Sequence, residues 1–318
     1  MPSLKHSSYA PSFAFKWTHL NTIYPAVFRS APVVEYQREI FETIDGDFLD
    51  LDWVKSENNR LMICLHGLEG SSDRPYVRAM IHRFHTAGWD GLALNFRSCG
   101  GELNKQLRMY NMGTTADLHQ LLKHLSKSYE SIVLVGFSLG GNLMTKYFGE
   151  GGDYLPRQVK GAVAISVPCY APTANIKIDG WENRAYLKRF MKTLNAKMQK
   201  KQVKFPDQIT LPSKMPRNFQ EFDAQFTAPV HGYCDAMDYW EHCSSLHFLE
   251  NIRRPLLMIN AIDDTFLSEE CYPHALAEKH PYFHLETPKH GGHCGFYSNT
   301  KDGFYWSENR ALAFLNDL

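Results

Sequence analysis

The chain has 318 residues, 44% hydrophobic and 21% charged, and its Lys and Arg residues equal its Asp and Glu residues at 34 each. This neutral balance gives no general attraction to nucleic acid or to an anionic membrane, so we expect neither as a partner. No apolar stretch reaches the roughly 18 residues of a membrane-spanning helix, and the first residues lack the apolar region of a secretory leader. The seven cysteines form no Cys-x-x-Cys pair and leave an odd one, which favours a reducing compartment. We therefore expect a soluble, cytoplasmic protein.

The chain begins with an extension and a hairpin. Residues 1–35 are polar and aromatic, and several of their apolar residues recur at helical spacing, so we predict a helix that packs on the main domain. Residues 38–44 and 48–54 alternate as strands do, and the Asp45-Gly46 pair between them is typical of a hairpin turn.

Beyond the hairpin, strands alternate with helices. Short apolar runs predict buried strands, and apolar residues at i, i+3, i+4 and i+7 predict amphipathic helices. In chain order we expect strand 61–65, helix 75–87, strand 91–96, helix 114–125, strand 132–135, a helix through residue 148, strand 161–167, strand 255–261, helix 269–277, strand 282–286 and helix 307–318.

The alternation breaks down across residues 169–251. This segment has charge-rich helical patterns, several prolines and many aromatic residues, so we predict an insertion that forms a cap over the catalytic face. Its basic run, 188–204, is interpreted as a solvated helix face. The remaining residues, 36–168 and 252–318, form the predicted core, an α/β fold with a mostly parallel eight-stranded sheet, helices on both faces and one antiparallel edge.

Residues 131–142 carry the most informative pattern. Apolar residues 132–135 lead into Gly136-Phe137-Ser138-Leu139-Gly140, which fits Gly-x-Ser-x-Gly, and a helical pattern follows. A serine on so tight a strand-to-helix turn projects above the sheet as a nucleophile does, and the glycines let strand and helix approach each other. The alternative is a glycine-rich turn with an incidental serine. The two interpretations are distinguished by whether the rest of the sequence supplies partners for a catalytic serine.

A serine nucleophile needs a base, and the base needs an anion that orients it. Asp263 and Asp264 follow the predicted strand 255–261, at the carboxyl end where ligands bind in such sheets. Adjacent carboxylates cannot both point at one imidazole. We favour Asp264 because the apolar Ala261 and Ile262 continue the strand and carry Asp264 deeper into the turn.

Two histidines compete for the role of base. His290 and His293 both follow the last predicted strand and flank Gly291-Gly292, where the backbone turns freely. After His293 the chain returns to apolar packing, whereas we expect His290 to be a solvated neighbour. We therefore favour His293 as the base.

An oxyanion hole needs two donors aimed at the charge that develops in the transition state. The backbone N–H of Leu139, at the start of the helix after Ser138, supplies one. The loop His66-Gly67-Leu68-Glu69-Gly70, which follows the strand 61–65, is placed to supply the other through Leu68 N–H. An ordinary strand-end turn is the alternative interpretation of this loop.

Other polar residues fit chemistry less well. His82 and His85 lie three apart on a helix without a third ligand at matching spacing, so we expect no metal and no other cofactor. Cys99 leaves a strand end without a histidine beside it, and packing is its expected role. Asp117 is expected to serve the first turn of its helix.

Taken together, these motifs resemble the YheT-like subfamily of α/β-hydrolases. The likeness extends over nearly the whole chain, through 18–23, 45–53, 66–70, 95–101, 136–142, 260–264 and 290–296. The resemblance implies a Ser138–Asp264–His293 triad with serine esterase or lipase-like activity. Relatives of this kind include bacterial carboxylesterases, phospholipid-acting members and acyltransferases. This chain departs from the pattern at Thr265, where proline is usual, and at Ser98, where glycine is usual.

We therefore expect a serine carboxylesterase that acts on a small-molecule ester through an acyl-enzyme on Ser138. The aromatic residues of 169–251 predict an apolar acyl pocket for uncharged, short-to-medium chains. The alternatives are acyl transfer to an alcohol with the same triad, and a ligand-binding scaffold without catalysis. The sequence carries no signal for an oligomeric state.

Overall fold

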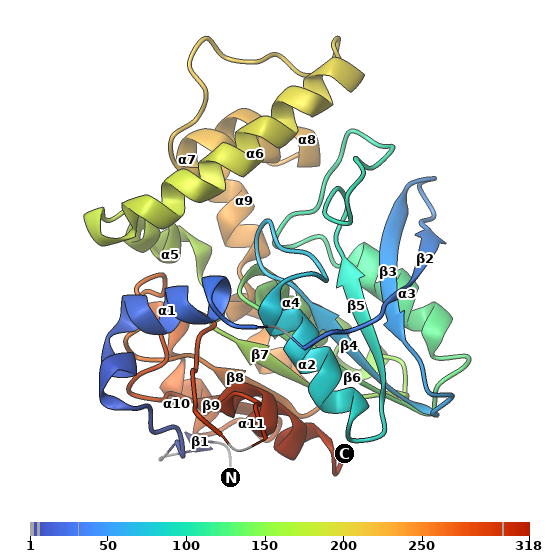
Figure 1. The fold of residues 1–318 in the computed structure, drawn as a ribbon. Coiled ribbons are helices and arrows are strands. Elements are labelled where there is room, and N and C mark those ends of the chain that lie inside the picture. Colours follow the sequence, from blue (N-terminus) through green and yellow to red (C-terminus); the bar gives the residue numbers. More distant parts are fainter. Residues whose placement is uncertain (1–2, 5–6, 31, 301) are drawn as a thin grey trace.

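The computed structural model describes residues 3–4, 7–30, 32–300 and 302–318. Its centre is a sheet with the strand order β1-β9-β8-β7-β6-β4-β5-β3-β2 (Figure 1). The strands are β1 Ser3–Leu4, β2 Gln37–Glu42, β3 Phe48–Val54, β4 Arg60–Leu65, β5 Asp90–Asn95, β6 Ser131–Phe137, β7 Val159–Ile165, β8 Leu256–Ile259 and β9 Phe283–Glu286. The eight predicted strands are confirmed, and β1 is a short addition that sequence periodicity did not indicate.

The sheet is parallel except at the edge formed by the predicted hairpin. Strand β3 runs antiparallel to both β2 and β5, while β4 pairs in parallel with β5 and β6. Strands β6, β7, β8 and β9 continue the parallel pairing, and β1 adds to β9. The carboxyl ends of the parallel strands therefore share one edge, where ligands bind in sheets of this kind.

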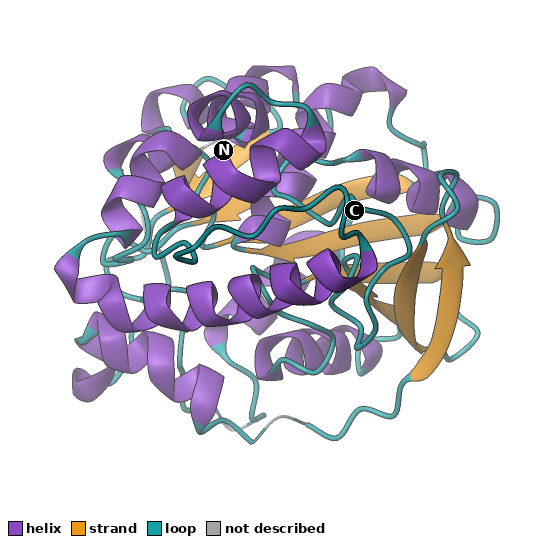
Figure 2. Ribbon diagram, turned by 90° about the horizontal axis from the view of Figure 1, so that it is seen from above, coloured by secondary structure: helices purple, strands orange, loops and turns teal. Residues whose placement is uncertain are grey.

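Helices cover both faces of the sheet because its central strands are apolar on both sides. Alternate residues of β6 divide between two hydrophobic clusters, with Ile132 and Leu134 on one face and Val133 and Val135 on the other. The first face packs against α3 Ala116–Leu125 and α4 Leu139–Gly151, and the second against α2 Pro75–His85 and α11 Trp306–Leu315. Figure 2 shows the strands enclosed between helices.

The segment between β7 and β8 rises above the carboxyl edge of the sheet (Figure 1). Among its described residues the segment contains helices and loops but no strand, with α5 Ala171–Ile178, α6 Arg184–Lys204, α7 Phe219–Phe222, α8 Ala228–His231 and α9 Ala236–Cys243. Its own cluster of apolar side chains, including Leu187, Met191, Leu194 and Phe222, packs against Leu68 of the core. We call this segment the cap.

The interpretation of 188–204 as a solvated face is wrong for two of its lysines, Lys197 and Lys201, whereas Lys204 is exposed as expected. Lys201 is fully buried, and its Nζ reaches the backbone carbonyl oxygens of Asn104 and Gln106. Lys204 Nζ lies 3.0 Å from the same Asn104 oxygen, and Lys197 pairs with Glu69. The periodicity of α6 alone could not show this, because the partners lie on two core loops that precede these lysines by 95 to 128 positions in the sequence.

Two other expectations meet different outcomes. The helix predicted over 269–277 is wrong: it divides into a 3-10 turn, Glu269–Cys271, and a single turn, α10 His274–Ala277, because Pro273 cannot continue a helix. The helix predicted in the N-terminal extension is confirmed as α1 Thr18–Val27. No helix of the described residues is long and apolar enough to cross a membrane.

Candidate active site

Ser138 stands on the turn between β6 and α4. Its backbone angles are φ 52° and ψ −118°, a strained conformation for a residue with a side chain. The turn is possible only with glycines around it: a Cβ on Gly136 would lie 2.8 Å from the carbonyl oxygen of Gly140, and one on Gly140 would collide with His66. Ser138 N–H donates to Ile165 O at 2.8 Å, which ties the turn to the neighbouring strand.

His293 and Asp264 form a hydrogen-bonded line with Ser138. The distance from His293 Nε2 to Ser138 Oγ is 3.0 Å, and the distance from His293 Nδ1 to Asp264 Oδ2 is 2.8 Å. The side chain of Asp264 is completely buried and that of His293 is 11% exposed. The loops after β6, β8 and β9 thus bring a hydroxyl, an imidazole and a carboxylate together at one edge of the sheet.

The rival residues form a second pair beside the first. His290 Nδ1 lies 3.5 Å from Asp263 Oδ2, and Asp263 Oδ1 accepts a hydrogen bond from Gly292 N–H at 2.9 Å. Asp263 therefore supports the loop that carries His293 and does not contact the imidazole itself.

The structure places Asp264 against His293. The expectation that Ala261 and Ile262 continue the strand inward is wrong. Strand β8 ends at Ile259, and Ile262 is 53% exposed instead of continuing the strand inward. A tight turn sets the direction of the carboxylate: Asp264 N–H donates to Ala261 O at 3.1 Å, and Asp264 Oδ1 accepts from Phe266 N–H at 3.0 Å.

The electrostatics of His293 reflect two opposing influences. Burial alone would lower the pKa of His293, but the charge of Asp264, the neighbouring Cys294 and the hydrogen bonds to both together outweigh burial and raise the pKa above the ordinary 6.5. The hydrogen bond to Asp264 fixes the proton on Nδ1 and leaves Nε2 free to accept a proton from Ser138. The ring of Phe266 stacks on the imidazole at a centroid distance of 4.2 Å.

Three consecutive backbone amides hold the His293 loop in place. Gly292 N–H donates to Asp263, His293 N–H donates to Thr22 Oγ1 at 2.9 Å, and Cys294 N–H donates to Ser166 Oγ at 2.8 Å. Thr22 belongs to α1, so the N-terminal helix contacts the loop directly. Sequence reasoning missed this role of Thr22, although the residue lies in the 18–23 motif that carries the resemblance.

The oxyanion loop, residues 66–70, faces Ser138 from the other side. A Cβ on Gly67 would lie 3.2 Å from Ser138 Cβ, so the loop passes directly beside Ser138. Gly67 N–H donates to Tyr76 Oη at 3.0 Å and Glu69 N–H donates to Tyr110 Oη at 2.9 Å. Between them, Leu68 N–H has no hydrogen-bond partner among the described residues. Leu139 N–H lies in the first turn of α4, where helical hydrogen bonds leave amides unused.

Glu69 is held through its backbone amide, its backbone carbonyl and one carboxylate oxygen, Oε1. Its carboxylate accepts from Tyr110 Oη at 2.7 Å and from Lys197 Nζ at 2.6 Å. Its carbonyl oxygen accepts from Arg74 at 2.7 Å. None of Tyr76, Tyr110 and Lys197 was predicted from the sequence, because nothing local to a tyrosine or a lysine indicates which distant loop it contacts.

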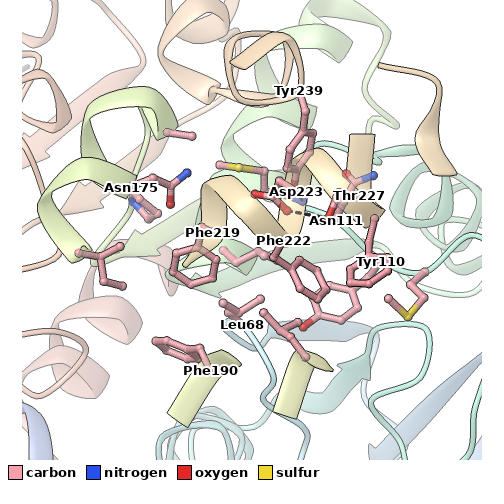
Figure 3. A pocket seen from close by; sticks show the side chains of 18 of the residues that line it. Leu68, Tyr110, Asn111, Asn175, Phe190, Phe219, Phe222, Asp223, Thr227 and Tyr239 are labelled. Atoms are coloured by element: carbon pink, nitrogen blue, oxygen red, sulfur yellow. Dashed lines mark hydrogen bonds between the residues drawn. The ribbon is translucent and has the colours of Figure 1, made fainter. Parts of the chain in front are cut away.

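Two cavities meet at Ser138 and His293. The first lies under the cap, has a volume of about 1090 Å³ including its open part, and is lined mainly by apolar side chains. Figure 3 shows Leu68 of the oxyanion loop together with Phe190, Phe219 and Phe222 of the cap around this space. Of the aromatic residues expected in an acyl pocket, those that line it are Phe190, Phe219, Phe222, Phe226 and Tyr239.

The second cavity is lined by α1, the segment 67–76 and the cap helix α6, among others. It shares Leu68, Ser138, Phe190, Phe266 and His293 with the first cavity, and its other lining residues include Thr22 and Arg74. A reacting group at Ser138 could therefore extend in two directions, one mainly apolar and one of mixed character.

The remaining candidate residues are scattered. His82 packs on Phe304, and His85 Nδ1 lies 3.3 Å from Trp89 O. Cys99 is half-buried with its Sγ 3.6 Å from Lys197 Nζ. Asp117 lies in the first turn of α3 as expected, and in addition it pairs with Arg97 at 2.6 Å.

The two departures from the family pattern have local explanations. Thr265 Oγ1 donates to Asn183 Oδ1 at 2.7 Å, and Asn183 Nδ2 donates back to Thr265 O at 2.8 Å, which joins the turn after Asp264 to the cap. Ser98 has φ 65°, a region that favours glycine. Its hydroxyl compensates by donating to Asn104 Oδ1 at 2.6 Å and accepting from Asn104 N–H at 3.1 Å.

Comparison with known proteins places this site in a family. The family model of the alpha/beta hydrolase fold matches residues 60–300. The chain is also 32% identical over 305 residues to a putative esterase YheT of Escherichia coli, covering 92% of this chain and 88% of that protein. The chain belongs to the YheT-like subfamily of α/β-hydrolases.

Other relatives agree with this membership. The chain is 28% identical to the phospholipase ABHD3 of Homo sapiens over 281 residues, which cover 84% of this chain and 68% of that protein. The solved structure of the Pyrococcus furiosus esterase Pf2001 superposes with a TM-score of 0.62 at 19% identity, over 89% of this chain and 91% of that one. At that identity the structural match supports the fold alone. An esterase and a phospholipase are among the relatives of this chain, which supports its general assignment as a hydrolase.

Proposed function

We propose that the protein hydrolyses carboxylic esters through an acyl-enzyme on Ser138, with His293 as the base and Asp264 as the residue that orients it. The hydrogen-bonded line from Asp264 through His293 to Ser138, at 2.8 and 3.0 Å, is the observation that supports this most strongly. An esterase and a phospholipase among the relatives agree with ester substrates.

In the first half-reaction, Ser138 Oγ attacks the ester carbonyl carbon while His293 Nε2 takes the hydroxyl proton. The carbonyl oxygen becomes an anion, and the N–H groups of Leu68 and Leu139 donate to it, each worth about 3–4 kcal/mol of barrier. The tetrahedral intermediate then expels the alkoxide, which leaves as an alcohol with the proton from His293. Water repeats the sequence on the acyl-enzyme and releases the carboxylic acid.

The two cavities suggest how an ester lies in the site. The acyl chain fits the cavity under the cap, where Phe190, Phe219 and Phe222 form much of the wall. The alcohol portion then extends into the second cavity, past Thr22 and Arg74. This arrangement favours uncharged acyl chains of short to medium length. It also assigns separate roles to three parts of the chain: an N-terminal extension, 1–35, a core, 36–168 with 252–318, and a cap, 169–251.

The second cavity also favours a second candidate function, acyl transfer. A site that holds an alcohol beside Ser138 while excluding water would pass the acyl group to that alcohol instead of to water. Both reactions use the same acyl-enzyme, and only the second half-reaction differs.

A panel of p-nitrophenyl esters of increasing chain length, assayed below the micellar range, tests the proposal. We expect turnover with a maximum at short to medium chains, and a loss of about 10⁶-fold in Ser138→Ala. Adding an alcohol and measuring the ratio of exchanged ester to free acid separates hydrolysis from transfer. Ligand-dependent thermal stabilisation without turnover of any ester would instead indicate a binding scaffold and contradict the proposal.

A further inference from the structure

A closed set of contacts joins the cap to the oxyanion loop. Glu69 Oε1 accepts hydrogen bonds from Lys197 Nζ at 2.6 Å and from Tyr110 Oη at 2.7 Å. Tyr110 Oη in turn accepts from Glu69 N–H at 2.9 Å. The ion pair is largely removed from solvent, with side-chain exposures of 12% for Lys197 and 8% for Glu69. It is therefore not one of the exposed surface pairs that contribute little.

The charges of this pair depend on each other. Burial alone would lower the pKa of Lys197, but the neighbouring Cys99 and Glu69 raise it above its ordinary value, so the amine stays protonated. Removing one partner of a buried pair leaves the other charge without compensation, which is more costly than never burying the pair. Glu69 without Lys197 would therefore be drawn towards solvent.

Glu69 also has a backbone that needs support. Its φ is 53°, in the left-handed region that residues with side chains rarely adopt. This conformation fixes the course of the chain next to Leu68. The N–H groups on either side, of Gly67 and Glu69, donate to tyrosine hydroxyls, whereas Leu68 N–H has no partner among the described residues. A change at Glu69 would move Leu68 N–H relative to Ser138, and a displacement of about 1 Å at a reacting centre can cost about 10²-fold in rate.

We propose that Lys197 of the cap is a positioning residue for the oxyanion hole: its ion pair with Glu69 holds Leu68 N–H in place. This proposal rests on the proposed ester hydrolysis. The cap then does more than line the acyl pocket, because one of its side chains completes the support of a catalytic donor. The acyl-binding element and the oxyanion hole are thereby joined through a single helix, α6.

Helix α6 supplies a matched control one turn further along. Lys201 is also buried and also binds the core, but its Nζ reaches the carbonyl oxygens of Asn104 and Gln106. It lines neither cavity at Ser138 and does not contact the oxyanion loop. Lys197→Met and Lys201→Met thus make the same chemical change at two anchors of one helix, and only the first touches Glu69.

The experiment measures kcat and KM for the best p-nitrophenyl ester, the rate of Ser138 modification by a fluorophosphonate, and the thermal midpoint of each variant. For Lys197→Met we expect kcat and the modification rate to fall about 10- to 100-fold, in proportion to a misplaced oxyanion donor. We expect KM to change less than about threefold, because substrate binding in the ground state does not use this donor. Lys201→Met should lower the thermal midpoint but keep kcat within about twofold.

A double variant keeps the test valid if Lys197→Met folds poorly. Glu69→Gln removes the buried charge and retains an acceptor for Tyr110, so adding Lys197→Met to it should cost much less activity than Lys197→Met alone. Equal losses of kcat in Lys197→Met and Lys201→Met, or no loss in either, would overturn the proposal, since Lys197 would then be only an anchor of the cap. Wild-type protein that neither turns over esters nor reacts at Ser138 would instead refute the proposed function itself.

Discussion

The two sides of Ser138 are supported in different ways. On the histidine side, three consecutive amides of the loop 292–294 donate to Asp263, Thr22 and Ser166, and two of these acceptors are neutral hydroxyls. On the oxyanion side, the loop 66–70 depends on tyrosine hydroxyls and on a buried ion pair from the cap. Each side thus uses one element outside the core, α1 for the histidine and α6 for the oxyanion loop.

The two sides differ in the free-energy cost of losing one of these supporting contacts. A neutral hydrogen bond contributes about 1 kcal/mol, so losing one loosens the histidine loop without leaving a buried charge. A broken buried ion pair leaves a charge without a partner and costs about 3–5 kcal/mol. We therefore expect the histidine side to tolerate changes in its supports better than the oxyanion side. The exception is Asp264, whose charge the proposed mechanism requires.

The largest expected effect on the histidine side is at Asp264. Asp264→Asn should lower kcat about 10⁴-fold, because the amide no longer holds the proton on His293 Nδ1 and the wrong tautomer faces Ser138. Asp263→Asn is the matched control: its Oδ1 can still accept from Gly292 N–H, and we expect a loss below about tenfold. Steady-state kinetics of both variants measure this. A greater loss in Asp263→Asn would reverse the assignment.

The pH dependence gives the next effect in size. The base must be neutral to accept a proton, and Asp264 raises the pKa of His293 above its ordinary value. Activity should therefore rise with pH through the neutral range, by about tenfold per pH unit below that pKa. In Asp264→Asn the rising limb of the residual activity should move to lower pH, because the charge that raises the pKa is gone. A profile of kcat/KM that stays flat from about pH 6 to pH 9 would contradict this account of the base.

The smallest effect is expected at Thr22. Thr22→Val keeps the shape of the side chain but removes the acceptor of His293 N–H, so we expect kcat to fall by about tenfold or less. Thr86→Val removes an exposed hydroxyl that bonds Arg83 O on α2 and should leave kcat unchanged. If Thr22→Val cost more than Lys197→Met, the proposed contrast between the two sides of Ser138 would be wrong.

The fold was predictable because its determinants are local. Buried strands such as 132–135 are short apolar runs, and the amphipathic period places helices such as α2 within a residue or two. The helix predicted over 269–277 failed where a single residue, Pro273, overrode the pattern. The two-residue strand β1 is too short to show any period.

The candidate site was predictable in part. Ser138, Asp264 and His293 stand in motifs at strand ends, so chain order and chemistry suggest them as a triad, and the structure brings their side chains within hydrogen-bond distance. The argument from Ile262 was mistaken, because Ile262 is exposed. Their supports were not predictable, because Thr22, Tyr110 and Lys197 act across long distances in sequence and carry no motif of their own. A lysine in a basic helix gives no sign that it is buried against a glutamate 128 positions earlier.

The reactivity of Ser138 tests the central claim most directly. The wild-type protein and Ser138→Ala are treated with a fluorophosphonate, and the intact mass and the modified peptide are determined. We predict one adduct per wild-type chain, located on Ser138, and none in the variant, because only an activated serine reacts in this way. A wild-type protein that remains unmodified, or an adduct on another residue, would contradict the assignment of Ser138 as the nucleophile.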